Sequence, residues 1–580
     1  MDALVIDLTH GGVKIAVGLK KLGKFDNIYA YDIYNTIKNE DSDLLSFHNI
    51  HILKNEVDLK NYLDNLVDLD ILIVNPIHSP FNFYNILNNS KFNSGKINIE
   101  NITSGKISVE NININHSNNA NSTNINQNFN PQIDITEITH HKAIKLILNK
   151  WKNDIANKNI PVVEVTGVKG KTSVVSMLKE ILLYQSPLVL SSLGACYYKK
   201  GKKLILKKNI SITPASILET IDIAKKIDNP NCINIDDLIR IDESPNNSPD
   251  NLNYNIGYGA CIFESSLGAT GLGDVGVLTN LVENYPIAKN TSNARNAKKQ
   301  VFDCDIVVIE KETLHNFYIS DDISKDSLNN SFDFNNLHSS SGCYNKAILS
   351  KINTFSFNDN SANLVLDSVS YGLNNTRIKL IYKNILTNLG DRISGSLVID
   401  TFAPGKHHVL NVLCAVTVSL SLGIDKDQIK RGLINFKGIK GRTSLKNYNN
   451  SIIIEEINPG INTKAIESSI KMIDSFDDYT IILGGKYGVT CEEIDENKVA
   501  NLLDNLLNDS DYKLKNNSNK NSKKKLDLIL TDDLGIEIEK KMLHNVEIIK
   551  NPIDAQKKVI SNNKNILFIY RSNYSQINKR

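Results

Sequence analysis

The segment that most constrains the fold runs from residue 161 to residue 184, where a buried strand, a glycine turn and an amphipathic helix follow one another directly. The strand 161–165 is mostly apolar, and the helix 172–184 repeats apolar residues at helical spacing. Between them lies Thr166-Gly167-Val168-Lys169-Gly170-Lys171-Thr172-Ser173. A glycine turn between a strand and a helix brings backbone N–H groups and the helix N-terminus to one point, which favours an anion. The segment therefore predicts a phosphate-binding loop.

Two side chains of this loop carry its predicted chemistry. The Lys171 ammonium is expected to reach the β and γ phosphates of ATP, and the Thr172 hydroxyl is expected to ligate Mg²⁺. The strict nucleotide-binding spacing requires glycine at position 165, where this chain has valine. The alternative is an ordinary tight turn before a helix, but Gly-Lys-Thr-Ser in a strand–turn–helix context favours ATP with Mg²⁺.

Strands and helical segments alternate along most of the chain, which is typical of α/β folds with a parallel sheet between helices. The predicted strands are 3–8, 28–31, 71–74, 161–165, 260–263, 275–279, 305–309, 452–456, 479–483, 527–530, 546–549 and 566–570. A helical pattern over 408–422 ends at Gly423, a typical helix stop.

The length of 580 residues predicts three domains with insertions. Stretches rich in Asn, Ser and Asp lack the periodicity of a packed core and are interpreted as insertions or surface loops. The expected organisation is an N-terminal Rossmann-like substrate domain (1–85), an Asn-rich insertion (86–135), a central P-loop domain (136–438) with insertions near 226–254 and 320–342, and a C-terminal α/β domain (439–580) with a polar loop near 507–524.

Composition narrows the class of protein. The formal net charge is +2, so no strong field favours a nucleic acid partner. Seven cysteines occur without a C-x-x-C pair, which argues against a disulfide framework or a structural zinc site and indicates a reducing cytoplasm. No apolar run approaches the roughly 20 residues that span a bilayer, so no membrane partner is expected. The oligomeric state is not predicted.

Thr-Gly-x-x-Gly-Lys-Thr-Ser resembles the central ATPase domain of Mur ligases and folylpolyglutamate synthetases. Further segments fall into that family's order along residues 161–460. They are Ile262-Phe263-Glu264-Ser265-Ser266, Val277-Leu278-Thr279-Asn280, Asn296-Ala297-Lys298, Gly405 to Asn411, Gly441-Arg442, and Glu455-Glu456 with Asn458-Pro459. The resemblance implies a three-domain Mur ligase-like architecture. A central P-loop ATPase with a parallel sheet is flanked by an N-terminal Rossmann-like domain and a mobile, Rossmann-like C-terminal lid.

The resemblance also implies the residues of phosphoryl transfer. Glu264 corresponds to a magnesium ligand, with a helix-capping acid as the alternative. Lys298 corresponds to a lysine whose carbamate binds metal, with a solvated helix face as the alternative. Lys171, Glu264 and Lys298 are thus the expected catalytic residues. Some family members place a histidine near a second magnesium. In this chain a run containing Tyr285 stands in that region, so the resemblance does not imply a second magnesium site.

The resemblance also implies that three residues in the later part of the chain contact the nucleotide. Asn411 corresponds to an adenine contact, or is a capping polar residue on its helix. Arg442 corresponds to a phosphate contact, or is a surface arginine at a hinge. Glu456 corresponds to the acid that meets the ribose, with Glu455 as its rival. His408 stands where the family usually has asparagine.

In these departures and in its segments 5–13 and 455–462, the chain resembles one branch of the family, the coenzyme F430 synthetases of methanogenic archaea. That branch implies activation of a carboxylate on a nickel-containing seco-tetrapyrrole acid, followed by ring closure through a carbon–carbon bond. His10, Gly11 and Gly12 are expected to contact the substrate, although the glycines alternatively permit only a close helix–strand approach. The competing functions are an amide-forming ligase and a nucleotide-binding protein without catalysis.

Overall fold

The computed structural model describes residues 1–64, 70–79, 81, 107–108, 134–228, 240–241, 257–319, 348–372, 375–439, 442–448, 451–457, 461, 463–473, 479–486, 494–516 and 527–572. Most of the predicted insertions near 86–135, 226–254 and 320–342, and also Gly441 and Asn458-Pro459, lie outside these residues. The chain forms two compact units. The first comprises Met1–Val365, Tyr382–Gly395 and Leu413–Asp425, and the second comprises Leu366–Ile381, Ser396–Val412 and Lys426–Arg580.

The first unit begins with a six-stranded sheet in the order β3-β2-β1-β4-β6-β5. Its strands are β1 (Asp2–Ile6), β2 (Ile28–Tyr31), β3 (His51–Leu53), β4 (Ile71–Asn75), β5 (Ile107–Ser108) and β6 (Asp134–Thr139). All neighbours are parallel except β5 and β6. The predicted strands at 28–31 and 71–74 are confirmed, and the three-residue β3 was missed because it is too short to show periodicity. Strand β6 follows the Asn-rich stretch, so this sheet is not confined to the first 85 residues.

Helices of this region pack the N-terminal sheet against the central one. They are η1 (Leu8–Gly12), α1 (Val13–Leu22), α2 (Asn39–Phe47), α3 (Glu56–Asp64), α5 (His140–Asn153) and α7 (Pro214–Asp228). Helix α5 contacts both α1 and α7. A single apolar core includes Ile15 of α1, Trp151 of α5 and Ile217 of α7. Burial of each such side chain stabilises the fold by about 1.5–3 kcal/mol relative to its exposure.

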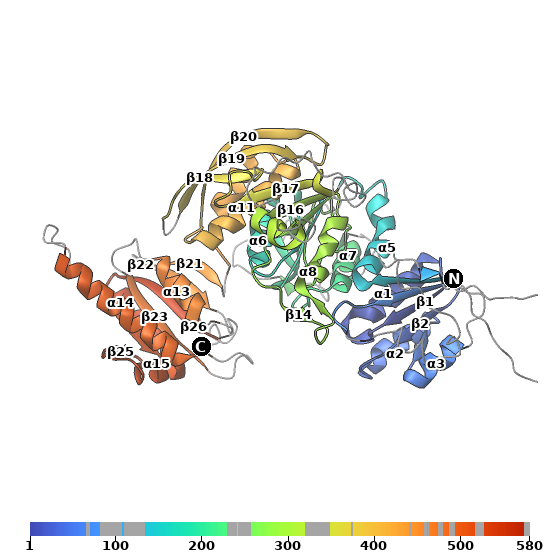
Figure 1. Ribbon diagram of the computed structural model, residues 1–580, viewed down its shortest axis with the longest axis horizontal. Coiled ribbons are helices and arrows are strands. Elements are labelled where there is room, and N and C mark those ends of the chain that lie inside the picture. The colour runs from blue at the N-terminus through green and yellow to red at the C-terminus, as the bar shows by residue number, and fades with distance from the viewer. Residues whose placement is uncertain are drawn as a thin grey trace, which may run out of the picture. The chain divides into compact units, whose positions relative to one another are not determined.

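The central sheet has the order β11-β10-β9-β8-β12-β7-β13-β16-β17-β18-β19-β20 (Figure 1). Strands β8, β12, β7, β13, β16 and β17 run parallel. The strands are β7 (Val162–Thr166), β8 (Leu188–Ser191), β9 (Gly194–Lys199), β10 (Lys202–Lys207), β11 (Arg240–Ile241), β12 (Cys261–Glu264), β13 (Val275–Leu278), β16 (Ile306–Glu310), β17 (Ile352–Ser356), β18 (Leu364–Ser370), β19 (Thr376–Leu386) and β20 (Arg392–Thr401). Strands β14 (Pro286–Ile287) and β15 (Ser292–Asn293) form a separate pair. The predicted parallel sheet is confirmed, with each predicted strand within one residue of its observed start.

Helices connect these strands. They are α6 (Lys171–Ile181), η3 (Leu183–Gln185), α8 (Ala294–Lys298), η5 (Lys299–Asp303), α9 (Lys311–Leu314), η6 (His315–Ile319), α11 (Lys406–Ser421) and α12 (Lys426–Asn435). The helix predicted over 408–422 is therefore confirmed as α11. Gly423 follows it with a φ of +70°, which suits a glycine after a helix.

The second unit contains a six-stranded sheet in the order β21-β22-β26-β23-β24-β25. Its elements are β21 (Thr443–Tyr448), β22 (Ser451–Ile457), α13 (Thr463–Lys471), β23 (Tyr479–Gly485), α14 (Glu496–Asn516), β24 (Asp527–Thr531), α15 (Asp532–Glu539), β25 (Glu547–Ile548), α16 (Pro552–Ser561) and β26 (Asn565–Arg571). Only β21 is antiparallel to its neighbour. Helices α13, α14 and α15, which are labelled in Figure 1, pack on one face, and α16 packs on the other, so the sheet is covered on both sides.

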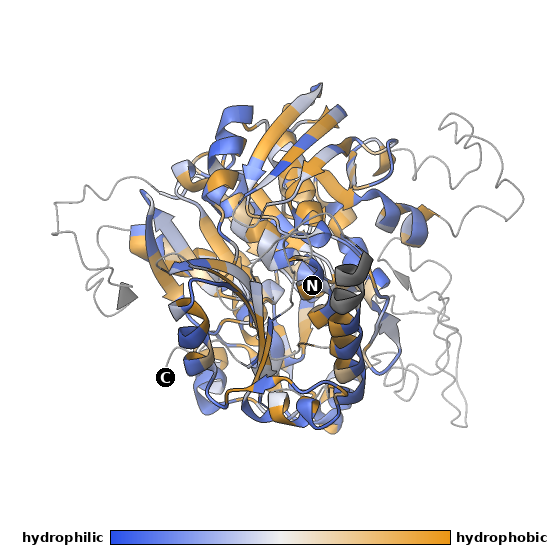
Figure 2. Ribbon diagram, turned by 90° about the vertical axis from the view of Figure 1, so that its left-hand side faces the viewer, coloured by the Kyte–Doolittle hydropathy of each residue, from blue (hydrophilic) through white to orange (hydrophobic). Residues whose placement is uncertain are grey.

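One prediction in this unit is wrong. Helix α14 continues to Asn516, into the segment expected to be a polar loop from residue 507. The reason lies in its apolar spacing, because Leu503, Leu506 and Leu507 pack together against the sheet. Colouring by hydropathy shows apolar residues concentrated on the strands, with polar residues along the outer helix faces (Figure 2).

Candidate functional site

The phosphate loop connects β7 to α6 at the carboxyl edge of the central sheet. Gly170 caps the N-terminus of α6 with a φ of +84°. The Lys171 ammonium donates to the Gly167 carbonyl at 3.0 Å and to the Val168 carbonyl at 3.4 Å, so the lysine lies back across the loop. Ser173 follows in the first turn of α6 and is partly exposed. The predicted strand–turn–helix arrangement is thus present, and β7 is central in the sheet, where ligands bind in open α/β folds.

Gly167 has to be glycine for two reasons. Its φ is +145°, and a Cβ at this position would lie 2.0 Å from Thr279 Oγ1. The close neighbour holds the loop in place, because Thr279 Oγ1 donates to the Lys169 carbonyl at 2.6 Å. The Lys169 backbone N–H in turn donates to Asn280 Oδ1 at 3.1 Å. Thr279 and Asn280 therefore anchor the loop from the end of β13.

The Thr172 hydroxyl and the Glu264 carboxylate meet beside the loop, as the resemblance implied. Thr172 Oγ1 donates to Glu264 Oε1 at 3.0 Å, and both side chains are buried. Glu264 Oε2 accepts the Ser192 N–H at 3.0 Å, which fixes the carboxylate. Ser192 was not predicted, because only the fold brings the end of β8 next to β12. Thr166 Oγ1 and Ser265 Oγ are buried at the same edge and have no hydrogen-bond partner within the described ranges.

These oxygen donors fit a magnesium ion. Mg²⁺ selects hard oxygen ligands in an octahedron, whose neighbouring ligands are about 3 Å apart when each lies about 2.1 Å from the ion. The hydroxyl of Thr172 and the carboxylate of Glu264 have this chemistry and this separation of 3.0 Å. Glu264 ends a buried strand, so the alternative of a surface acid at a helix cap is wrong.

Lys298 lies at the end of α8 and is fully buried. The alternative of a solvated helix face is therefore wrong. Its Nζ donates to the Ser266 carbonyl at 2.6 Å. Burial, together with the nearby Lys171 charge, lowers the pKa of Lys298 to about 7. A lysine with this pKa is partly neutral near pH 7, and the neutral amine is the form that adds carbon dioxide.

Two buried histidines, His140 and His141, begin α5, and neither was singled out by the sequence analysis. His140 Nε2 lies 2.8 Å from the Ile6 carbonyl, and burial lowers the pKa of His140 to about 4. Neither ring nitrogen of His141 has a partner among the residues described. Burial lowers the pKa of His141 to about 3, and the charges of His140, His78 and Lys298 add to this effect. His141 therefore lies within electrostatic reach of both Lys298 and the N-terminal domain.

The remaining nucleotide residues lie in the second unit. Asn411 is buried on α11, and Arg442 is exposed just before β21. Burial raises the pKa of Glu456 on β22, and a 2.5 Å hydrogen bond from Thr443 Oγ1 opposes that rise. Glu455 is buried and accepts a hydrogen bond from Lys446 Nζ at 2.7 Å. Their contacts with a nucleotide stay predictions.

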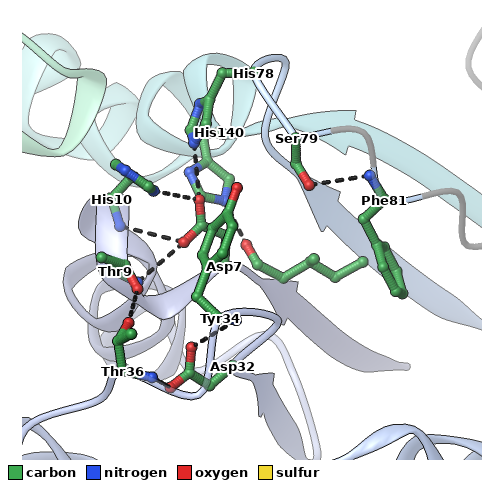
Figure 3. Close-up of polar contacts among 11 residues, drawn as sticks. Asp7, Thr9, His10, Asp32, Tyr34, Thr36, His78, Ser79, Phe81 and His140 are labelled. Carbon is green, nitrogen blue, oxygen red and sulfur yellow. Dashed lines mark hydrogen bonds and ion pairs between the residues drawn. The ribbon is translucent and has the colours of Figure 1, made fainter. Parts of the chain in front are cut away.

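The turn after β1 contains the predicted substrate residues His10, Gly11 and Gly12. Figure 3 shows His10 beside Asp7. A Cβ at Gly12 would lie 2.2 Å from the Asp7 carbonyl oxygen, and a Cβ at Gly11 would lie 2.4 Å from Ala215 Cβ. Both glycines therefore permit a close approach of chain segments, and their contact with a substrate stays a prediction. Asp7 joins His10 and His78 in one hydrogen-bonded cluster, which sequence reasoning missed.

No helix of the described residues is long and apolar enough to cross a membrane.

Comparisons with known proteins agree with this geometry. Residues 445–573 match the family of the coenzyme F430 synthetase CfbE, C-terminal domain. The coenzyme F430 synthetase of Methanosarcina acetivorans is 25% identical over 513 residues, which cover 86% of each chain. That of Methanocaldococcus jannaschii is 26% identical over 374 residues, covering 64% of this chain and 69% of the relative.

Among solved structures, the UDP-N-acetylmuramate-alanine ligase MurC of Thermotoga maritima is 16% identical, with a TM-score of 0.41 over 100% of this chain and 98% of that one. The chain is thus similar along most of its length to a coenzyme F430 synthetase, and its residues 445–573 match the model of the C-terminal domain of that family.

Proposed function

We propose that this protein is an ATP-dependent ligase that acts as a coenzyme F430 synthetase. The observation that carries the proposal is the joint placement of Lys171, the Thr172–Glu264 pair and the buried Lys298 at one edge of the central sheet. A protein that only binds a nucleotide has no need of a buried carboxylate and a second buried lysine beside the phosphates. The relatives named coenzyme F430 synthetase support the choice of substrate.

The proposed reaction starts by activating a carboxylate, which is a poor electrophile. The γ-phosphoryl group of ATP moves to a carboxylate oxygen of the nickel seco-tetrapyrrole acid, giving an acyl phosphate and ADP. A carbon nucleophile of the same molecule then attacks the acyl carbon, and its C–H proton is lost as phosphate leaves. The product contains a new carbon–carbon bond and a ketone, and the tetrapyrrole has lost the elements of one water molecule.

The residues of the site have distinct tasks in this scheme. The backbone N–H groups of the loop and the Lys171 ammonium hold the phosphates in line with the acceptor carboxylate. Thr172 and Glu264 would hold Mg²⁺, which neutralises phosphate charge when bound. Lys298, once carbamylated, would add a further oxygen ligand. Positioning and charge stabilisation supply most of the acceleration in phosphoryl transfer.

Three residues of the second unit are further candidates for contacts with the nucleotide. We assign Asn411 to the adenine, Arg442 to the phosphates and Glu456 to the ribose, on the resemblance of their segments to those of Mur ligases. The raised pKa of Glu456 suits a carboxyl group that a ligand hydroxyl contacts at low solvent exposure. The four cysteines of the described residues are buried free thiols, which supports a reducing, cytoplasmic setting.

Product analysis tests the proposal. The purified protein is incubated with ATP, Mg²⁺ and either the nickel seco-tetrapyrrole acid or a mixture of amino acids with a peptide or folate-like acceptor. We expect ADP release that depends on the tetrapyrrole, together with a product lighter by one water molecule. A product that has gained an amino-acid residue would instead establish an amide-forming ligase. If neither acceptor leads to ADP release, the remaining hypothesis is a protein that binds a nucleotide without catalysis.

A further inference from the structure

The carboxyl edge of the N-terminal sheet holds a second cluster of chemically active side chains. The chain leaves β1 toward β2 and β3 on one side, while β4 and β6 lie on the other. The carboxyl ends of β1 and β4 therefore border the point at which the strand order reverses, where open α/β sheets bind ligands. Asp7 and His10 follow β1, and His78 follows β4.

The cluster is organised by one buried carboxylate (Figure 3). Asp7 Oδ1 accepts the Thr9 N–H at 3.0 Å and the His10 N–H at 3.3 Å. Asp7 Oδ2 lies 2.8 Å from His10 Nδ1 and 2.8 Å from His78 Nε2. Both oxygens of Asp7 therefore serve as acceptors, Oδ1 for two backbone N–H groups and Oδ2 beside two imidazole nitrogens, which is the role of an ionised carboxylate. An anionic carboxylate only accepts hydrogen bonds, so both imidazoles direct an N–H toward it.

This arrangement fixes the tautomer of each neutral imidazole. His10 carries its proton on Nδ1, and its Nε2 then has a free lone pair. His78 carries its proton on Nε2 and has its lone pair on Nδ1. A histidine held in this way by a carboxylate is the usual form of a metal-ligating histidine in proteins. The two histidines are 45% and 27% exposed, whereas Asp7 is fully buried, so the cluster presents nitrogen ligands outward and hides its carboxylate.

The backbone at Asp7 indicates that the arrangement is under constraint. Asp7 has φ +68° and ψ +92°, which lies outside the regions favoured by residues with a side chain. Such outliers cost of order 1–3 kcal/mol and concentrate at functional sites. Gly12 accommodates the displaced Asp7 carbonyl, because any Cβ there would meet that oxygen.

An apolar group connects the segment that carries His78 to the phosphate loop. Ile77, the neighbour of His78, packs into an apolar group with Val168 of the loop, Tyr285, and Ala297 next to Lys298. A large acceptor held by the histidines would therefore reach the residues of phosphoryl transfer. Tyr34 lies beside His10, with ring centroids 5.6 Å apart, and its side chain is 42% exposed. An exposed aromatic ring next to a metal-ligating nitrogen suits a flat macrocycle that contains a metal.

We propose that His10 Nε2 is an axial ligand to the nickel of the tetrapyrrole substrate, with Asp7 as the positioning residue that holds the imidazole. The inference rests on the proposed function and identifies how that substrate is held. His10 is chosen over His78 because Nε2 is remote from the histidine backbone, whereas a nickel at Nδ1 of His78 would crowd its Cβ. His78 completes the cluster by sharing the Asp7 carboxylate.

The test follows the absorption spectrum of the nickel seco-tetrapyrrole acid during titration with the full-length protein. Axial ligation changes the coordination number of nickel, which shifts the visible bands and is counted directly by X-ray absorption. We expect a shift with the wild-type protein and its loss in His10→Gln, with at least a roughly tenfold weaker affinity. Imidazole added to His10→Ala is expected to restore the shift. His51→Gln is the matched control, because His51 also stacks on a tyrosine of this sheet but lies outside the cluster.

Asp7→Asn provides a separate readout of positioning. An amide directed at His10 Nδ1 donates instead of accepting, which moves the imidazole proton to Nε2 and removes the lone pair. We expect the spectral shift to be lost while ATP still binds and circular dichroism is unchanged. A structural role alone would alter stability without changing the nickel spectrum of the bound tetrapyrrole.

The outcomes separate this inference from the proposed function. If the wild-type protein closes the ring and His10→Gln gives the same nickel spectrum and KM, the ligand assignment is wrong and the ligase function stands. If the wild-type protein neither binds nor converts the tetrapyrrole, the proposed function fails. Binding of free Ni²⁺ or Zn²⁺ that requires His10, without any effect on the bound tetrapyrrole, would show a resident metal site and overturn the inference.

Discussion

The phosphate loop and the Asp7–His10–His78 cluster lie at the carboxyl ends of parallel strands in two sheets, yet the sequence encodes them in different ways. The loop consists of eight consecutive residues, and most of its binding groups are backbone amides. The cluster joins residues 7, 10 and 78, and its binding groups are side chains from two strand ends. A site made of backbone appears as a continuous motif, whereas a site made of distant side chains appears only after folding.

The largest effect is expected at the loop. Lys171→Ala should lower the rate of ADP release roughly 10²–10³-fold, because one preorganised positive charge is lost from the transition state. Circular dichroism should be unchanged, since the glycines that shape the loop remain. Lys179→Ala, on the same helix and paired with Glu180, is the control. Undiminished turnover in Lys171→Ala would remove the loop from the mechanism and leave the N-terminal cluster as the better-supported site.

A smaller effect is expected at the metal-binding pair. Glu264→Gln keeps the shape of the side chain but removes its charge. The new amide N–H group also faces the Ser192 N–H, so two hydrogen-bond donors meet. We expect the Mg²⁺ concentration for half-maximal activity to rise by roughly tenfold or more. Titration of activity with Mg²⁺ measures this, with Glu180→Gln as the control. An unchanged Mg²⁺ requirement would mean that Glu264 is not a ligand.

The next expected effect is a pH dependence of ligase activity, which comes from the protonation of Lys298 near the phosphate loop. Its pKa of about 7 means that it becomes protonated as the pH falls below that value. A protonated amine does not add carbon dioxide, so ligase activity should fall by up to about tenfold per pH unit below pH 7. A carbamate resonance from ¹³C-labelled bicarbonate should appear in the wild-type protein and be absent in Lys298→Arg. A flat pH profile between 6 and 8 would contradict this role.

The smallest expected effect is on the free energy of unfolding, and it comes from His141 at the start of α5. The folded pKa of His141 is about 3, below the ordinary value of 6.5, so the unfolded chain binds more protons between these values. Stability is therefore lost as the pH falls below 6.5, by about 2 kcal/mol at pH 5. His141→Leu should reduce the difference in unfolding free energy between pH 8 and pH 5 by that amount. Urea unfolding is followed through Trp151, the single tryptophan, which lies on the same helix.

An equal pH dependence in His141→Leu and wild type would show that His141 is not held neutral in the fold. His51→Leu serves as the control, because His51 is exposed. Its replacement should leave the pH dependence of unfolding unchanged.

Much of the fold was predictable because its signals are local. Apolar runs such as Ile71 to Val74 and Tyr479 to Leu483 became buried strands where expected. Elements with weaker local signals were missed or misjudged, including the short β3 and the final turns of α14. Short strands owe their formation to pairing with neighbours, which periodicity along a single segment cannot reveal.

The site divides in the same way. Glu264 and Lys298 were identified by resemblance, but only burial showed that neither is an ordinary surface residue. Asp7 interrupts an apolar strand, and His78 follows the strand end at Asn75-Pro76. These signals were visible in the sequence. Pairing them required the knowledge that β1 and β4 are adjacent and parallel.

By itself, the sequence predicted the phosphate loop, the alternation of strands and helices and the resemblance to Mur ligases, because each of these depends on motifs whose residues are close together in the chain. The tertiary structure alone decided that Ser192 fixes Glu264, that Lys298 is desolvated beside Lys171, and that Asp7 holds two histidines. The physical reason is that pKa values, tautomers and ligand geometry depend on neighbours in space, and in this protein those neighbours come from strand ends that are far apart in the sequence.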